Sequence, residues 1–383
     1  MSKLLDDIVV LSILGPQGSG KSTVFKKLRQ RWDKNAIFLP DIAEECPIDL
    51  TDKKKLHQYP ELGNLVTTWM TCQMIKAQID AIGPRIGEGP TTILQDINPL
   101  SQLVYPEAIK GSCDEHIAEF VKEYCALVPQ NLSFIIPGNL EFLVDDGKRD
   151  VDPKYQKKVE DTFRNVFARH DFPHIFLPSS PTAQVWFIDR YLAHQLGQSE
   201  EAPKKVHEIE IKCLLTPEEY RCLDRELNEG YQPLCKETVE TLKFTPGDHR
   251  VRIREGETTK YEVVIKEGDV VDHVRTEYSI HLEDEIMAEQ VREGFASEGM
   301  GTDPKWVKHK QEFAAQMGGY DYVICLQEIE NFGYLLEVEK MSSVDDSHIH
   351  VPNLKQIISN LGLEPIGPHE FQERVKDYIR DNQ

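Results

Sequence analysis

The sequence predicts two domains of different class. The first is an α/β domain, a parallel sheet with helices on both faces, and the second is an α+β domain built on an antiparallel β-barrel. Three observations predict this. Short apolar runs alternate with helical patterns up to residue 195, a polar stretch containing Gly and Pro covers 196–205, and apolar residues then recur at every second position. We therefore expect domains at 1–195 and 206–383, joined by a linker at 196–205.

Strand and helix patterns alternate through the first domain. The expected elements are a strand at Val9–Leu14, helices at Ser22–Trp32 and Leu65–Ile82, and strands at Leu132–Ile136 and His174–Leu177. Asp152 followed by Pro153 is typical of a helix N-cap and the first helical position. The residues that follow place apolar side chains on one stripe, which predicts a further covering helix.

Charged residues alternate with apolar ones in the predicted strands of the second domain. These strands are Glu208–Lys212, Val251–Arg254, Tyr261–Lys266, Glu277–Leu282, Tyr322–Gln327 and Tyr334–Lys340, with helices at Thr216–Asn228 and from Asn353 onward. Glu208-Ile-Glu210-Ile-Lys212 places three charges on one side and two isoleucines on the other, because residues i and i+2 share a face. A barrel with a polar interior, covered outside by helices, explains this pattern.

The composition limits the function classes. Of 383 residues, 40% are hydrophobic and 28% charged, and the formal net charge is −21. That charge argues against docking on long nucleic acid or an anionic membrane. No apolar run predicts a transmembrane helix. The eight cysteines form no CxxC pair, so we expect free thiols and a cytoplasmic location.

A phosphate-binding loop is the most specific motif of the first domain. Residues Gly15–Ser22 fit GxxxxGK[ST] between a predicted strand and a predicted helix. Backbone N–H groups of such a loop surround phosphate oxygens, Lys21 reaches the β and γ phosphates, and Ser22 contributes to Mg²⁺ binding. The expected contacts of ATP or GTP are Gly15, Gly18, Ser19, Gly20, Lys21, Ser22 and Thr23.

Four further residues could complete a phosphoryl-transfer site. Asp41 follows a second apolar run and is either an acceptor-activating base or the N-cap of the next helix. Asp96 ends another run, where a carboxylate helps to hold Mg²⁺. Lys148 and Arg149 lie in a loop that either closes over the transferred phosphate or is a solvated turn.

Residues 8–195 resemble the small P-loop kinases and ATPases that include ribosylnicotinamide kinases and relatives of deoxynucleoside kinases. The resemblance rests on Gly15–Ser22, the Asp41 region and the segment DDGKRDVDPKY. It implies nucleotide binding. Those kinases often have an arginine after the acid that corresponds to Asp96, where this chain has Ile97. Phosphorylation of a nucleoside-like acceptor is therefore left open.

The alternating charges of the second domain suit a metal-bound polyphosphate. Carboxylates are hard oxygen ligands for Mg²⁺ or Mn²⁺, and Lys and Arg donate to phosphate oxygens. We expect an acidic wall of metal ligands at Glu208, Glu210, Glu337 and Glu339. We expect a basic wall that binds phosphates at Lys212, Arg252, Arg254, Lys266, Arg275, Lys308 and Lys310.

Residues 206–365 resemble the CYTH, or triphosphate tunnel metalloenzyme, superfamily. The family's opening ExExK stands as Glu208–Lys212, and its closing GxxxExE ends at Glu337-Val-Glu339. The basic strand residues named above match the family's pattern in order. The chain departs from it at Gln327, where the family commonly has an acid, although Glu328 is adjacent.

The resemblance implies a two-domain enzyme that acts on phosphate anhydrides. The tunnel would hydrolyse tripolyphosphate, a nucleoside triphosphate or thiamine triphosphate, with Glu210 and Lys212 as catalytic residues. Water would be oriented by Glu210, or bound to metal beside Glu339. Two rivals remain: cyclisation of ATP in the same tunnel, and a nucleotide-gated regulator that binds polyphosphate without turnover. The oligomeric state, the physiological triphosphate and the coupling between domains stay undetermined.

Overall fold

The computed structural model describes the chain except for residues 1–4, 6, 49–59, 144–151, 269–272 and 383. It divides into two compact units, Met1–Ser199 and Glu200–Gln383. The division falls inside the stretch that the sequence predicts to be a linker. Each unit has its own sheet and its own apolar core.

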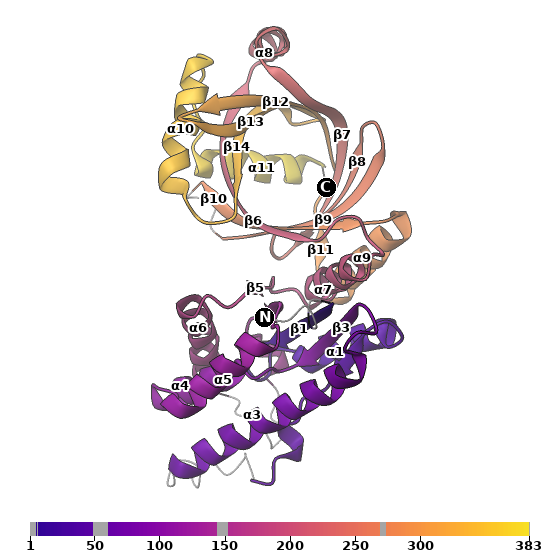
Figure 1. Cartoon of the computed structure of the whole chain (residues 1–383). Coiled ribbons are helices and arrows are strands. Elements are labelled where there is room, and N and C mark those ends of the chain that lie inside the picture. The colour runs from indigo at the N-terminus through magenta and orange to yellow at the C-terminus, as the bar shows by residue number, and fades with distance from the viewer. Residues whose placement is uncertain (1–4, 6, 49–59, 144–151, 269–272, 383) are drawn as a thin grey trace. The chain divides into compact units, whose positions relative to one another are not determined.

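The first unit contains a parallel sheet of five strands (Figure 1). The strands are β1 (Ile8–Leu14), β2 (Ile37–Leu39), β3 (Thr91–Asp96), β4 (Leu132–Ile135) and β5 (His174–Phe176). Their order in the sheet is β2-β3-β1-β4-β5, and every pairing is parallel. Strand β1 is therefore central, and its carboxyl end leads directly into the glycine-rich loop. The parallel α/β sheet that the sequence predicts is confirmed.

Helices cover both faces of this sheet. One face carries α1 (Lys21–Trp32) and α7 (Pro181–Gln195), and the other carries α3 (Pro60–Ile82), α4 (Ser101–Lys110), α5 (Glu115–Leu127) and α6 (Pro153–Arg169). Phe163 of α6 and Leu14 of β1 are fully buried in one shared cluster. Asp152 accepts a hydrogen bond from the backbone N–H of Lys154, which confirms the predicted N-cap.

The second unit is a closed antiparallel barrel of eight strands (Figure 1). They are β6 (Lys204–Leu215), β7 (Gln232–Thr245), β8 (His249–Glu255), β9 (Thr259–Glu267), β10 (Val274–Leu282), β12 (Trp306–Met317), β13 (Tyr320–Ile329) and β14 (Gly333–Ser342). Their order is β7-β12-β13-β14-β6-β10-β9-β8, and pairing of β7 with β8 closes the ring. The two-residue strand β11 (Gly301–Thr302) adds to β7. The predicted barrel is confirmed.

The apolar face of the barrel points outward under helices. Helices α8 (Pro217–Gly230) and α10 (Ser347–Asn360) cover Ile209 and Ile211 of β6, which are at most 1% exposed. Helix α9 (Glu285–Ser297) packs on β8, β9 and β10. This packing leaves the charged alternate positions for the interior.

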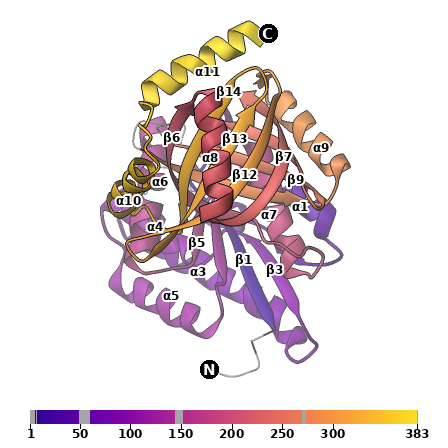
Figure 2. The same cartoon turned by 90° about the horizontal axis from the view of Figure 1, so that it is seen from above.

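The last helix, α11 (Pro368–Asn382), lies across one mouth of the barrel (Figure 2). The ring of Phe371 lies 5.6 Å from Lys212 Nζ of β6. Near its other end, the ring of Tyr378 lies 4.4 Å from that of Trp306, at the start of β12. The helix therefore bridges opposite sides of this mouth.

The structure adds elements that the sequence patterns do not predict. Helix α7 and strand β7 are the longest of them, α9 is another, and β6 begins at Lys204, inside the predicted linker. Both faces of β7 mix polar and apolar side chains, so its alternation is weak. In the described part of the chain, no helix is long and apolar enough to cross a membrane.

Candidate functional site

The glycine-rich loop joins the central strand β1 to the first turn of α1. Lys21 Nζ donates hydrogen bonds to the carbonyl oxygens of Gly15 and Pro16, both at 2.8 Å. Gln156 of α6 donates to the carbonyl oxygens of Gln17 and Gly18 at 3.0 and 3.2 Å. These bonds hold the loop's carbonyl groups, so its N–H groups are left to surround an anion at the N-terminus of α1.

Gly15 and Ser19 show two different requirements of this loop. A Cβ atom on Gly15 would lie 2.3 Å from the carbonyl oxygen of Ile136, and Gly15 has φ +142°. Such a contact is far inside van der Waals distance, so only glycine fits. The hydroxyl oxygen of Ser19 is buried and has no hydrogen-bond partner, which suits a residue whose partner is a bound phosphate.

The acidic residues predicted near this loop have different environments. Asp96 ends β3, is 5% exposed, and lies opposite Ile13 of β1 in the parallel register. The next residue, Ile97, has φ +74°, a strained conformation for a β-branched residue of the kind found beside functional sites. Asp41 accepts a hydrogen bond from the N–H of Ala43 at 2.8 Å, but the N-cap of the short helix Ala43–Glu45 is Ile42, so Asp41 is not its N-cap. Lys148 and Arg149 lie outside the described residues.

All the tunnel residues that the sequence predicts lie on the inner face of the barrel. Directly opposed residues of an antiparallel ladder project to the same side, and Arg252 opposes Glu262 while Glu337 opposes Lys212. The residues brought together are Glu208, Glu210, Lys212, Arg252, Arg254, Lys266, Arg275, Lys308, Lys310, Glu337 and Glu339. The assignment of faces from alternation is therefore correct.

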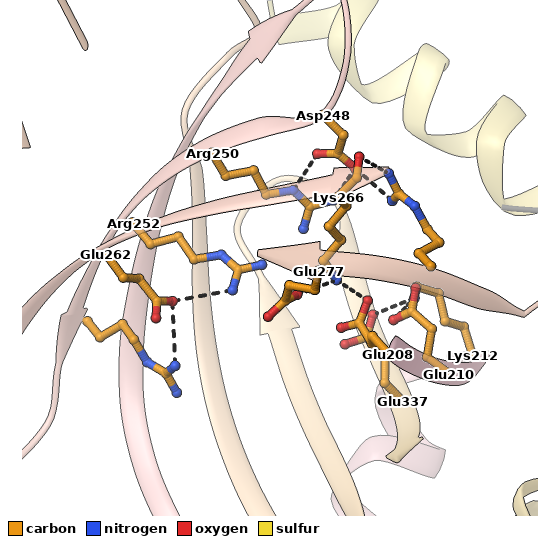
Figure 3. Close-up of polar contacts among 12 residues, drawn as sticks. Glu208, Glu210, Lys212, Asp248, Arg250, Arg252, Glu262, Lys266, Glu277 and Glu337 are labelled. Atoms are coloured by element: carbon orange, nitrogen blue, oxygen red, sulfur yellow. Dashed lines mark hydrogen bonds and ion pairs between the residues drawn. The ribbon is translucent and has the colours of Figure 1, made fainter. Parts of the chain in front are cut away.

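Ion pairs cross the interior in a network (Figure 3). Lys266 contacts Glu208, and lies 3.3 Å from Glu277. Lys212 contacts Glu210, and lies 3.1 Å from Glu337. Burial opposes the charge on Lys212, but both carboxylates outweigh it and raise the lysine pKa. The cations and acids are thus interleaved, and the predicted separation into one acidic and one basic wall is wrong.

Lys308 differs from the other interior cations. Among the described residues, no carboxylate oxygen lies within 4.0 Å of Lys308 Nζ, and this ammonium group makes no hydrogen bond. The inward-facing cations around it do form ion pairs. Burial lowers the pKa of Lys308 to about 8, with Glu337 opposing the shift and the charges of Arg250, Arg252 and Lys212 adding to it. A buried ammonium among cations is electrostatically suited to an anion.

The carboxylates of β14 differ from each other. Burial opposes ionisation of Glu337, but Lys212 and Lys308 outweigh it and hold the pKa of Glu337 well below its usual range. Burial raises the pKa of Glu339 to about 7, a shift that Lys310 opposes and that the carboxylates of Glu208 and Glu337 reinforce. Glu339 has no hydrogen bond or ion pair to any described residue. A divalent cation would supply the missing positive charge.

The clustering of metal-binding atoms departs from the prediction. Among the described residues, two groups have ligand atoms within 4.8 Å of one another: Cys235, Glu237 and Glu312, and Glu312, Cys325 and Glu339. The predicted set of Glu208, Glu210, Glu337 and Glu339 does not form such a group. Its first two members are engaged by Lys266 and Lys212 instead.

Several interior residues were not predicted from the sequence. Asp248 pairs with Arg250 at 2.6 Å (Figure 3). It also pairs with Arg275 at 2.7 Å, and Glu237 pairs with Arg254. Arg250 precedes Arg252 by two residues, so the alternation already pointed to it. Asp248 lies just before β8, where no alternation exists to indicate its direction.

Residues 10–184 match the family of AAA domains, which is less than half of the chain. No curated protein matches the chain. A solved protein of Pyrococcus horikoshii is 20% identical, covers 44% of this chain and 98% of its own, and has a TM-score of 0.39. A conserved hypothetical protein of Pyrococcus furiosus is 20% identical, with coverages of 41% and 91% and a TM-score of 0.33. A candidate adenylate cyclase of Bacillus halodurans is 15% identical, with coverages of 42% and 93% and a TM-score of 0.30.

Proposed function

We propose that the barrel hydrolyses the terminal anhydride of a small triphosphate in the presence of a divalent cation. The observation that carries this proposal is Lys308, a buried cation beside Arg250 and Arg252 with no carboxylate oxygen within 4.0 Å among the described residues. A phosphate oxyanion among these three side chains would neutralise the charge that the fold leaves uncompensated. The interior is lined by further donors, which suits a substrate with several phosphates rather than one.

The carboxylates on the facing strands support a metal requirement. Glu337 and Glu339, joined by Glu208 and Glu210 once phosphate replaces these two as partners of Lys266 and Lys212, would hold Mg²⁺ or Mn²⁺, for which carboxylate oxygen is the preferred ligand. The cation, when bound, supplies charge neutralisation on the polyphosphate. The raised pKa of Glu339 supports this assignment, because a nearby cation would stabilise the ionised carboxylate that the protein alone disfavours.

Different residues of the barrel bind the phosphates and activate the water. Lys308 and Arg252 bind phosphate oxygens and neutralise negative charge that grows on the leaving oxygen. Glu210, held by Lys212, orients a water molecule and accepts its proton as the water oxygen attacks the terminal phosphorus. The phosphorus–oxygen bond to the leaving phosphate then breaks, and the products are orthophosphate and the shortened polyphosphate.

The first unit is proposed to bind ATP or GTP through Gly15–Ser22. Lys21 would exchange its two carbonyl contacts for the β and γ phosphates. Ser22 and Asp96 would hold the accompanying Mg²⁺. Asp41 would serve as base toward a nucleoside-like acceptor if this unit is a kinase.

Product analysis tests the proposal. The full chain is incubated with tripolyphosphate, ATP or thiamine triphosphate and Mg²⁺ or Mn²⁺, and the products are separated by chromatography. We expect orthophosphate from tripolyphosphate, and a loss of turnover on the order of 10- to 100-fold in Lys308→Met, because a charge-assisted contact is removed. Lys305→Met, an exposed lysine outside β12, is the matched control. Cyclic AMP from ATP with tripolyphosphate left intact would refute hydrolysis and favour cyclisation.

A further inference from the structure

Thiols and carboxylates meet on the inner face of β7, β12, β13 and β14. In the ladder, Glu312 of β12 lies opposite Cys235 on one side and opposite Cys325 on the other. Cys235 Sγ donates to a carboxylate oxygen of Glu312 at 3.1 Å. Glu312 therefore belongs to both groups of closely spaced ligand atoms, and the two groups form one continuous patch.

The group of Glu312, Cys325 and Glu339 is the better candidate for a cation. In the other group, Glu237 already receives three hydrogen bonds from Arg254, so its charge is compensated. Glu339 has no such partner in the described part of the chain, and Cys325 is fully buried. Lys310 contacts Glu312 and its charge also acts on Glu339. The preference for this group therefore rests on the buried thiol and on a carboxylate at Glu339 that makes no direct ion pair with any described residue.

A second observation points to a missing ligand at the same place. Gln327 follows Cys325 by two residues and so shares its inner face. Its side chain is 1% exposed and its amide oxygen has no hydrogen-bond partner, although its amide nitrogen donates to Glu337. A buried acceptor without a partner among the described residues, one inward position along β13 from Cys325, favours a polar ligand such as a cation-bound water on this face.

We propose that Glu312, Cys325 and Glu339 bind a thiophilic divalent cation of the Zn²⁺ class, with water as the fourth ligand. Zn²⁺ accepts thiolate sulfur and carboxylate oxygen in a four-coordinate site. Mg²⁺ and Ca²⁺ prefer oxygen alone, so the thiol selects against them. On binding, the sulfur–hydrogen bond breaks, the proton leaves to solvent, and a sulfur–metal bond forms.

This site is distinct from the proposed hydrolytic metal but shares Glu339 with it. A cation held by Cys325 would occupy Glu339 and so exclude it from the set that includes Glu208 and Glu210. The two kinds of metal would therefore compete inside one barrel. The binding itself does not depend on the barrel being a hydrolase, because its ligands are argued from their own spacing.

Cobalt spectroscopy of the full chain tests the site without reference to turnover. Co²⁺ bound by thiolate gives a near-ultraviolet charge-transfer absorption, and Zn²⁺ titrated into the cobalt protein should abolish it. We expect Cys325→Ser to lose this absorption and to bind Zn²⁺ at least about tenfold more weakly. Cys222→Ser, an exposed cysteine on α8, should match the wild type in both measurements.

Two further variants distinguish the loss of a metal ligand from a folding defect. Cys235→Ser should keep the sulfur absorption, because Cys235 belongs to the other group of ligand atoms. Glu312→Gln should weaken Zn²⁺ binding while the sulfur absorption persists at saturating Co²⁺. Circular dichroism reports whether each variant is folded. The proposal is overturned if folded Cys325→Ser retains the absorption, or if the wild type binds Zn²⁺ no more tightly than Mg²⁺.

Discussion

Replacing Lys308 by methionine should stabilise the barrel while it weakens anion binding. Burial and cationic neighbours lower the pKa of Lys308 from its ordinary 10.5 to about 8. At about 1.4 kcal/mol for each pH unit, the folded state carries a penalty of about 3 kcal/mol at pH 7 for keeping this lysine charged. Methionine has a similar length and no charge, so the free energy of unfolding should rise by about that amount.

The pH dependence of this gain follows from proton counting. Between pH 8 and pH 10.5 the unfolded chain holds a proton on Lys308 that the folded chain has lost, so the wild type gains stability as pH rises. The advantage of Lys308→Met should therefore be full below pH 8 and vanish above about pH 10.5.

Lys310→Met provides the opposite control on the same strand and the same face. Lys310 contacts Glu312, so its removal leaves a buried carboxylate without its cation and should cost about 3 kcal/mol or more. The ligand-free full chain is unfolded with urea, and hydrogen exchange is monitored in peptides from β12 and β13. This measures the stability of the barrel separately from that of the first unit. A Lys308→Met barrel that is less stable than wild type at pH 7, or a gain independent of pH, would refute this reasoning.

Three further predictions concern the other site residues. Lys21→Ala should weaken ATP or GTP binding in calorimetry and leave tripolyphosphate hydrolysis intact, because the two units have separate cores. Gly15→Ala should lower the melting temperature of the first unit, since its Cβ would lie 2.3 Å from the carbonyl oxygen of Ile136; an unchanged melting temperature would contradict the close approach. Mn²⁺ affinity should rise with pH up to about 7 and then level off, because Glu339 must lose its proton to bind metal. In Glu339→Gln this rise should disappear from an electron paramagnetic resonance titration.

The predictions from the sequence succeeded where a local pattern has one structural meaning. Glu208-Ile-Glu210-Ile-Lys212 identified the inner face of its strand, because strand geometry alone decides which residues share a side. The loop from Gly15 to Ser22 likewise lies between a strand and a helix, as its motif requires.

The partners of each charge could not be predicted in the same way. Arg254 pairs with Glu237, which lies 17 residues away on a strand whose pattern is weak. Which residues oppose each other depends on the register of eight strands, and the alternation of any one strand does not contain that register. The mixing of acids with bases, and the meeting of Cys325 with Glu312 and Glu339, arise only when the ring closes.

The matching of interior cations by interior carboxylates has a kinetic consequence. Because nearly every inward lysine or arginine has its own acid, the barrel lining contributes little to the chain's formal charge of −21. That excess therefore belongs to the outer surfaces, where it repels an incoming polyanion. Added salt screens repulsion between exposed charges over a Debye length of about 8 Å at physiological ionic strength, but hardly affects buried pairs. Association of tripolyphosphate should then become faster as moderate salt is added, the reverse of what attractive steering gives.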